Sequence, residues 1–349
     1  KNILEKLELS IKDEINPGLG TMNRLFMASE LLHLKKKDWT GIRLGLIEEL
    51  EAHLHPQAQM QIIEALQKEK EIQLILSTHS PNLGSKIKLE NLIVCCDNYA
   101  FPMGKNFTEL ADNDYKFLER FLDTTKANLF FAKGIIMVEG WSEEILLPAI
   151  AQRLKEQDVI QRNLTEAGVS IVNVASTAFQ RYSRIYLRKN ESLKKMTIPV
   201  AIITDVDICA YEKTTLPNGA GGFDNIYNQK NEQVVSADSI LRTTQLETKY
   251  DRDNIKSFIA KDWTLEYALF KSTSLNVSFK EALLEIHPQM DSDHLQMELG
   301  KKLINKTLNK TELAYNLANK IEQNPTLVID ENDAGIKYLI GALKYVCND

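Results

Sequence analysis

Two apolar segments near the middle of the chain run directly into acidic residues. Residues 134–138 lead into Glu139, and residues 199–204 lead into Asp205-Val206-Asp207. Short apolar runs with helical patterns between them predict the buried strands of a parallel α/β sheet. The carboxyl ends of such strands meet at one edge of the sheet, which is where open α/β folds carry their sites. The sequence therefore predicts an acidic site at a sheet edge.

Four acidic residues are spaced so that they converge at this edge. Glu143 follows Glu139 by four residues, one turn into the helix predicted over residues 143–156. Asp205 and Asp207 alternate with one residue, so both side chains point to the same side of an extended segment. Clustered carboxylates repel unless cations are present, and hard oxygen ligands suit Mg²⁺ or Mn²⁺. We predict that these four residues hold two such ions, which can activate water for phosphodiester cleavage.

This arrangement of Glu-x-x-x-Glu and Asp-x-Asp, each after an apolar strand, resembles the Toprim fold of topoisomerases, primases and OLD (overcoming lysogenization defect) nucleases. The resemblance implies that Glu139 is both a metal ligand and a catalytic residue. OLD-family members also carry a lysine and a glutamate late in this domain, which map here onto Lys261 and Glu266. The resemblance implies that Lys261 offsets charge on the phosphate and that Glu266 completes the metal shell. A purely structural role for both residues at a helix start remains the alternative.

A second pair of acids follows a strand in the first hundred residues. The apolar run at 41–47 delivers Glu48 and Glu49, and a strand at 72–76 is followed by His79. The order resembles the Walker B, D-loop and H-loop series of ABC-type ATPases of the SMC, RecF and OLD kind. The resemblance implies that Glu48 binds the metal, Glu49 is the catalytic base and His79 contacts the γ-phosphate.

The nucleotide-binding parts of such an ATPase are incomplete in this sequence. Gly20, in a Gly-rich segment before a helix, resembles a degenerate signature motif, with a plain helix-entry turn as the alternative reading. No G-x-x-x-x-G-K-[ST] phosphate loop occurs. We expect either that an N-terminal lobe precedes Lys1 in the full-length protein and binds ATP there, or that the chain is a nuclease with an ATPase remnant.

Three arginines form a candidate DNA contact. Arg181, Arg184 and Arg188 lie at i, i+3 and i+7 of a helix predicted over residues 179–189. One helical face would then carry three guanidinium groups suited to phosphate oxygens. A solvated basic face without a ligand is the alternative.

Composition sets the remaining limits. The net charge of −6 excludes wholesale coating of nucleic acid but not a nuclease that binds cations. The 4 cysteines lack metal-site spacing, which favours reduced thiols in a cytoplasmic protein. No apolar run approaches the ~20 residues of a membrane span.

We interpret the chain as α/β throughout its first part and helical at its end. Residues 92–96 are expected to form a third strand of the first parallel sheet, and helical patterns occur at 1–9 and 22–34. The expected division is an ABC-type ATPase tail at 1–100, a helical connection at 101–133, a Toprim domain at 134–272 with a loop-like insertion at 208–254, and a helical region at 273–349.

A Toprim domain behind an ABC-type ATPase tail resembles the OLD family, which includes the Gabija-type defence nuclease. The resemblance implies a metal-dependent DNA endonuclease coupled to an ATPase, acting in anti-phage defence or DNA processing. It further implies a homo-oligomer formed through the ATPase half, with a helper protein as a possible partner. Two alternatives stay open: a topoisomerase or primase on the same fold, and an SMC-like or RecF-like ATP-driven DNA clamp whose Toprim acids are inactive.

Overall fold

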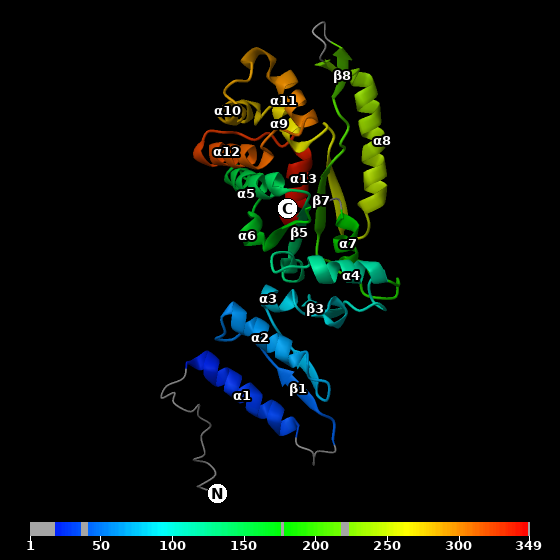
Figure 1. The fold of residues 1–349 in the computed structure, drawn as a ribbon, viewed down its shortest axis with the longest axis vertical. Helices are drawn as coiled ribbons and strands as arrows, with labels where there is room; N and C mark the ends of the chain where they lie inside the picture. The colour runs from blue at the N-terminus through cyan, green and yellow to red at the C-terminus, as the bar shows by residue number, and fades with distance from the viewer. Residues whose placement is uncertain (1–17, 36–40, 176–177, 218–222, 348–349) are drawn as a thin grey trace. The chain divides into compact units, whose positions relative to one another are not determined.

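The computed structural model describes residues 18–35, 41–175, 178–217 and 223–347 of the chain. They belong to two compact units, shown as a ribbon in Figure 1. The first unit comprises Lys1–Leu92 with Glu119–Phe131, and the second comprises Ile93–Leu118 with Ala132–Asp349. The helical pattern at residues 1–9 lies outside the described residues.

The first unit is built on two parallel strands, β1 (Leu44–Ile47) and β2 (Gln73–Leu76). Leu50, Ile63, Leu66 and Leu83 form its buried core. Every second residue of each strand is exposed, including Leu46 at 69% and Ile75 at 54%. The helices are α1 (Leu19–Leu34), α2 (Pro56–Leu66), α3 (Pro81–Gly84) and the short 3-10 helices η2 (Leu89–Asn91) and η3 (Lys126–Phe130).

The strand expected at residues 92–96 is present, but its expected place in a parallel sheet is wrong. It forms β3 (Ile93–Cys96), which pairs antiparallel with β4 (Tyr99–Pro102). Asp97 and Asn98 between them have φ of 49° and 62°, and this left-handed pair makes the tight turn of a hairpin. The next helix is α4 (Asp112–Phe121).

The second unit contains a parallel sheet with the strand order β10-β7-β5-β6. All five residues of β5 are buried, and so are the first five of β7. This burial on both faces explains the continuous apolar runs in the sequence. The parallel α/β fold is thereby confirmed, with strands β5 (Gly134–Val138), β6 (Val169–Asn173), β7 (Val200–Asp205) and β10 (Ile255–Ala260).

Helices cover both sides of this sheet. In Figure 1, α5 and α12 lie to one side of the strands and α8 lies to the other. Helix α13 packs against β5, β7 and β10. Helix α5 packs along α12, so the C-terminal part of the chain lies beside the helix that follows β5. These helices are α5 (Trp141–Glu156), α6 (Leu164–Ala167), α8 (Glu232–Tyr250), α12 (Lys310–Gln323) and α13 (Lys337–Cys347).

The single helix expected over residues 179–189 is wrong. Helix α7 (Phe179–Ser183) gives way to the 3-10 helix η4 (Arg184–Tyr186), and Leu187 is extended. Residues 185–188 are all buried. One face of an α-helix cannot bury four consecutive residues, so the chain leaves the helix here.

The loop expected over residues 208–254 is also wrong. Strands β8 (Tyr211–Pro217) and β9 (Phe223–Gln229) form an antiparallel hairpin, and α8 follows. The N-cap of α8 is Asn231, whose side chain accepts hydrogen bonds from two backbone amides of the first turn. Its buried residues include Ser239 and Thr243, so the apolar periodicity that predicts a helix is weak.

The helical C-terminal region is confirmed. After α9 (Leu265–Lys271), it contains α10 (Asn276–Ile286), the 3-10 helix η5 (Ser292–His294), α11 (Leu295–Ile304), α12 and α13. Across the part of the chain that the structure describes, no helix combines the length and the apolar character needed to span a bilayer.

Candidate active site

The first pair of predicted carboxylates follows β5. Glu139 comes directly after the strand and accepts a hydrogen bond from the Thr204 hydroxyl on the neighbouring strand β7. Glu143 lies in the first turn of α5, whose N-cap is Gly140. Both side chains are therefore positioned by a strand end and a helix start, as the sequence predicts.

The second pair lies at the end of β7, but its geometry differs from the expected one. Asp205 is the last residue of the strand, and its Oδ2 accepts a hydrogen bond from the Leu265 amide at 3.1 Å. Asp207 has a φ of 57°, and its amide donates to the Trp263 carbonyl at 3.0 Å. The segment is therefore not extended through Asp207, and the period-two argument fails two residues after the strand ends.

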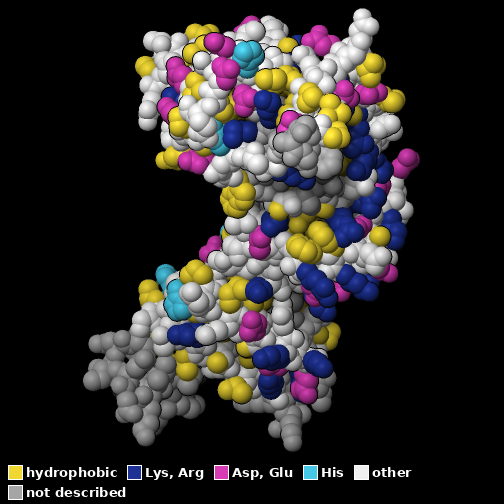
Figure 2. Space-filling view, turned by 45° about the horizontal axis from the view of Figure 1, so that its top comes forward, with side chains coloured by type: hydrophobic (Ala, Val, Ile, Leu, Met, Phe, Trp, Pro, Cys, Tyr) yellow, Lys and Arg dark blue, Asp and Glu magenta, His cyan; other side chains and the backbone are white. Residues whose placement is uncertain are grey.

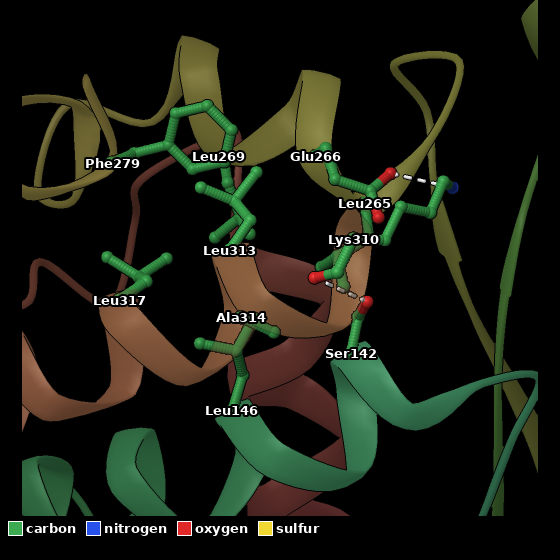
Figure 3. Close-up of a pocket in the computed structure, with 10 residues that line it drawn as sticks. All are labelled: Ser142, Leu146, Leu265, Glu266, Leu269, Phe279, Lys310, Leu313, Ala314 and Leu317. Atoms are coloured by element: carbon green, nitrogen blue, oxygen red, sulfur yellow. Dashed lines mark hydrogen bonds and ion pairs between the residues drawn. The ribbon is translucent and has the colours of Figure 1, made fainter. Parts of the chain in front are cut away.

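Glu266 enters the cluster from α9. Thr264 is the N-cap of this helix, as the sequence suggests, and its hydroxyl also donates to Glu266 Oε2 at 2.9 Å. The Glu266 side chain is 4% exposed and forms an ion pair with Lys310, whose Nζ lies 2.9 Å from Oε2. Figure 3 shows this ion pair and the second contact of Lys310, whose carbonyl accepts from the Ser142 hydroxyl at 3.3 Å.

The carboxylates influence one another electrostatically. Burial raises the pKa of Glu143 to about 7, and the charges of Glu266 and Glu139 add to the rise. Burial and the charges of Glu143, Glu266 and Glu139 raise the pKa of Asp205 well above its ordinary value. Burial likewise raises the pKa of Glu139, and the charge of Asp207 adds to the rise. The five acidic side chains thus share one electrostatic environment.

Lys310 is the positive group of this environment. Burial lowers its pKa, but the charges of Glu266, Asp205 and Glu143 outweigh burial and raise the pKa above its ordinary value. Its side chain is 48% exposed. Carboxyl groups therefore outnumber the ammonium group in this environment.

The donor set fits divalent cations. Carboxylate oxygens are the preferred ligands of Mg²⁺ and Mn²⁺, and bound cations would offset the burial and the repulsion that raise the pKa values of Glu139, Glu143 and Asp205. Among the described residues, no three carboxylate, imidazole or thiol groups already form a coordination sphere. The side chains instead accept hydrogen bonds from Thr204, Thr264 and the Leu265 amide. The residues present therefore suit a cation, although their oxygens are not yet gathered around one point.

Lys261 comes directly after β10, whose last residue pairs with Asp205, and its catalytic role stays a prediction. Its side chain is exposed, and its carbonyl accepts from the Ser239 hydroxyl at 2.6 Å. The lysine paired with the carboxylates is Lys310, in the first turn of α12 and far from the motifs along the chain. Its local signal is the helix start at Asn309, whose side chain accepts from the Glu312 amide. That signal predicts a helix but no partner for Lys310.

The three arginines do not share one exposed face. Arg188 is buried, and its guanidinium donates to the Pro102 carbonyl at 2.7 Å. Arg181 and Arg184 both pair with Asp114, at 3.6 and 3.1 Å, and their side chains are 43% and 36% exposed. Arg188 therefore stabilises the packing of the hairpin β3–β4 and is not placed to contact a phosphate. Figure 2 shows Lys and Arg side chains gathered along the right-hand edge, the side on which Figure 1 places α7 and α8.

The residues expected in the ATPase site follow the two parallel strands of the first unit. Glu48 and Glu49 come after β1 and His79 comes after β2, and all three are exposed. Glu49 has a φ of 46°, and its amide donates to the Ser77 hydroxyl at 3.4 Å. The His79 amide donates to Glu51 Oε1 at 2.6 Å, so Glu51 links the two strand ends. The sequence pattern does not predict this role of Glu51.

Gly20 lies inside α1, in its first turn, and not in a loop. A Cβ at this position would lie 2.4 Å from the carbonyl oxygen of His53. The close approach of the helix to this backbone explains the glycine without a nucleotide, which supports the helix-entry reading at this position.

Two family models match separate parts of the chain. Residues 130–207 match the family model described as "Overcoming lysogenization defect protein-like, TOPRIM domain". Residues 3–83 match the model described as "AAA ATPase domain". The chain thus carries an OLD-like Toprim domain behind an ATPase segment, and its resemblance to the OLD family is confirmed.

The relatives are distant. The chain is 24% identical over 224 residues to the endonuclease GajA of Bacillus cereus (strain HuB5-5), an alignment that spans 55% of this chain and 31% of that protein. The C-terminal region of the Xanthomonas campestris pv. campestris OLD protein is 20% identical, with a TM-score of 0.36, and the match covers 63% of this chain and 96% of that one. The corresponding region from Burkholderia pseudomallei is 21% identical, with a TM-score of 0.36, covering 63% and 98%.

Proposed function

We propose that this chain is the nuclease part of a metal-dependent DNA endonuclease whose activity is coupled to an ATPase. The observation that carries the proposal is the electrostatic coupling of Glu139, Glu143, Asp205 and Glu266 at the end of the sheet, together with the ion pair between Glu266 and Lys310. Carboxyl groups that raise one another's pKa values in this way are characteristic of functional sites. The OLD-like Toprim match and the endonuclease relative support the same reaction class.

The proposed metal ligands are Glu139, Glu143, Asp205, Asp207 and Glu266. Two Mg²⁺ or Mn²⁺ ions bound there would supply an activated water and stabilise the leaving oxygen of a phosphodiester. Thr204 holds the Glu139 carboxylate by a hydrogen bond, and the Leu265 amide holds that of Asp205. Such outer contacts fix the orientation of ligands before a cation arrives.

Lys310 is proposed to carry out the role that the sequence interpretation assigned to Lys261. Its ammonium lies beside Glu266 and its side chain is half-exposed, so it can donate to a non-bridging phosphate oxygen as negative charge develops there. Ser142 and Glu266 fix the two ends of the residue, its carbonyl and its Nζ. Lys310 is thus held in place before the substrate binds.

The substrate is proposed to be DNA, with the partly exposed Arg181 and Arg184 as phosphate contacts. The ATPase role of Glu48, Glu49 and His79 is a further part of the proposal, with the matched ATPase segment as its support. Assembly through the ATPase half and a function in anti-phage defence follow from the OLD-family resemblance and are proposed on that basis.

A plasmid-cleavage assay tests the function. Supercoiled DNA is incubated with the protein and Mg²⁺, Mn²⁺ or EDTA. We expect cleavage with a divalent ion and none with EDTA. Binding of Mn²⁺ without cleavage of any DNA form would favour the inactive-clamp alternative, and relaxation without nicking would favour a topoisomerase.

A further inference from the structure

Tyr338, on α13, presents a hydroxyl that the proposed chemistry does not use. The hydroxyl oxygen is buried and, within the described part of the chain, has no hydrogen-bond partner. Burying a polar group without a partner is unfavourable, and most buried hydroxyls in folded proteins are hydrogen-bonded. An unpaired hydroxyl of this kind therefore needs a functional or structural explanation.

The packing of α13 on β10 shows where this hydroxyl lies. Near the end of α13, the Tyr345 hydroxyl donates to the Asn254 carbonyl at 2.9 Å, just before β10 starts. One turn earlier, Gly341 lies against Phe258, since a Cβ there would be 3.2 Å from the ring. The helix therefore runs opposite to the strand, and Tyr338 comes one further turn toward the strand's carboxyl end.

This end of β10 is the edge that carries the carboxylates. Ala260 pairs with Asp205 in the register of β10 and β7. Side chains on a helix lean toward its N-terminus, which directs Tyr338 further toward that edge. Burial raises the pKa of Tyr338 well above its ordinary value, and the charges of Asp205, Glu143 and Glu266 raise it further. The phenol accordingly stays protonated and faces the acidic cluster.

We propose that Tyr338 is a positioning residue, whose hydroxyl donates a hydrogen bond to the Asp205 carboxylate when the site holds a cation. The inference rests on the proposed metal-dependent function. Asp205 Oδ2 already accepts from the Leu265 amide on one side. A second donor from α13 would fix the plane of the carboxylate and leave its remaining lone pairs to the cation.

The test compares Tyr338→Phe with the wild-type protein by calorimetric titration of Mn²⁺ in the absence of DNA. Phenylalanine keeps the ring and removes only the donor. We expect the affinity for Mn²⁺ to fall roughly 10–100-fold, the usual effect of removing an outer-shell donor. We expect the melting temperature of the metal-free protein to stay the same or rise, because an unpaired buried hydroxyl is removed.

Tyr345→Phe is the matched control, since it removes a hydroxyl from the same helix at the opposite end of β10. It breaks the bond to Asn254, so we expect a lower melting temperature and unchanged Mn²⁺ affinity. Equal Mn²⁺ affinity of wild type and Tyr338→Phe would overturn the positioning role while leaving the proposed nuclease intact. Absence of Mn²⁺ binding by the wild-type protein would overturn both.

Discussion

Glu49 in the first unit and Asp207 in the second are alike in one respect: each follows a parallel strand with a left-handed backbone, at φ of 46° and 57°. Non-glycine residues in this region are uncommon and cluster at functional sites. Their surroundings differ. Strand β7 before Asp207 is buried over its first five residues, whereas β1 before Glu49 is exposed at every second residue.

The two units differ in the burial of their acidic side chains, and burial is what raises the pKa of a carboxyl group. In the second unit, the carboxyl groups of Glu139, Glu143 and Asp205 come from elements far apart in the sequence, and their pKa values rise because burial withholds water from the charge. In the first unit, Glu48, Glu49 and His79 stay exposed, and the described contacts are made mainly by backbone amides with Ser77 and Glu51. In both units, acidic residues thus follow a parallel strand. The units differ in how deeply those acidic side chains are buried.

The largest expected effect is that of Asp205→Ala, which tests the site assigned in the second unit. Removing a ligand at the end of a buried strand should abolish cleavage of supercoiled DNA, because no neighbouring residue can replace an oxygen held by the Leu265 amide. Circular dichroism should show an intact fold, since loss of like charge relieves repulsion. Glu247→Ala, at an exposed acid of α8, is the control and should cut normally. Wild-type cleavage by Asp205→Ala would disprove the assigned site.

The next effect concerns the two candidate lysines. We expect Lys310→Ala to lower the single-turnover rate by ~10²–10³, the usual loss for one preorganised charge at a transition state. Lys310→Arg should rescue poorly, because a planar fork does not replace a compact ammonium. Lys261→Ala should cleave at close to the wild-type rate, since the ammonium group paired with Glu266 is that of Lys310. If the two alanine variants rank in the opposite order, the sequence-based assignment of Lys261 is the better one.

A smaller effect concerns stability in EDTA. The folded-state pKa of Glu143 is raised to about 7 from 4.5, so the folded protein binds a proton more tightly than the unfolded chain. Stability should then fall as pH rises from about 5 to 7, and the slope should shrink in Glu143→Gln. At pH 8 we expect this variant to be more stable by about 1 kcal/mol, or ~2–4 °C in melting temperature. If melting temperature changed with pH equally in both proteins, the pKa of Glu143 would not be raised in the folded state.

The smallest expected effect is that of Glu49→Gln on stability. Because Glu49 is exposed, the change in unfolding free energy should stay within about 0.5 kcal/mol. In the full-length protein the same variant should lose ATP hydrolysis if Glu49 is the catalytic base. A large destabilisation would mean that the first unit encloses Glu49 as the second encloses Glu143, and the contrast between the units would disappear.

Local patterns predict much of this molecule correctly. The strands before Glu139 and Asp205 are buried on both faces, and such strands read as continuous apolar runs. Thr264 is a helix cap, which depends on one hydroxyl and one nearby amide. Helix α8 was missed because its buried face includes hydroxyl side chains, and β3 was given the wrong partner because an apolar run does not specify strand direction.

What the sequence determined by itself is the placement of acids at strand ends, since a strand's burial and the residue after it are both local properties. The tertiary structure decided which other groups meet those acids. Lys310 reaches Glu266 from 44 positions along the chain because α12 packs on α5, and Tyr338 reaches the same edge because α13 packs on β10. Arg188 lies in a buried segment, residues 185–188, and its side chain therefore points into the interior of the protein. Contacts between distant segments depend on how helices pack on the sheet, and a local pattern carries no information about that packing.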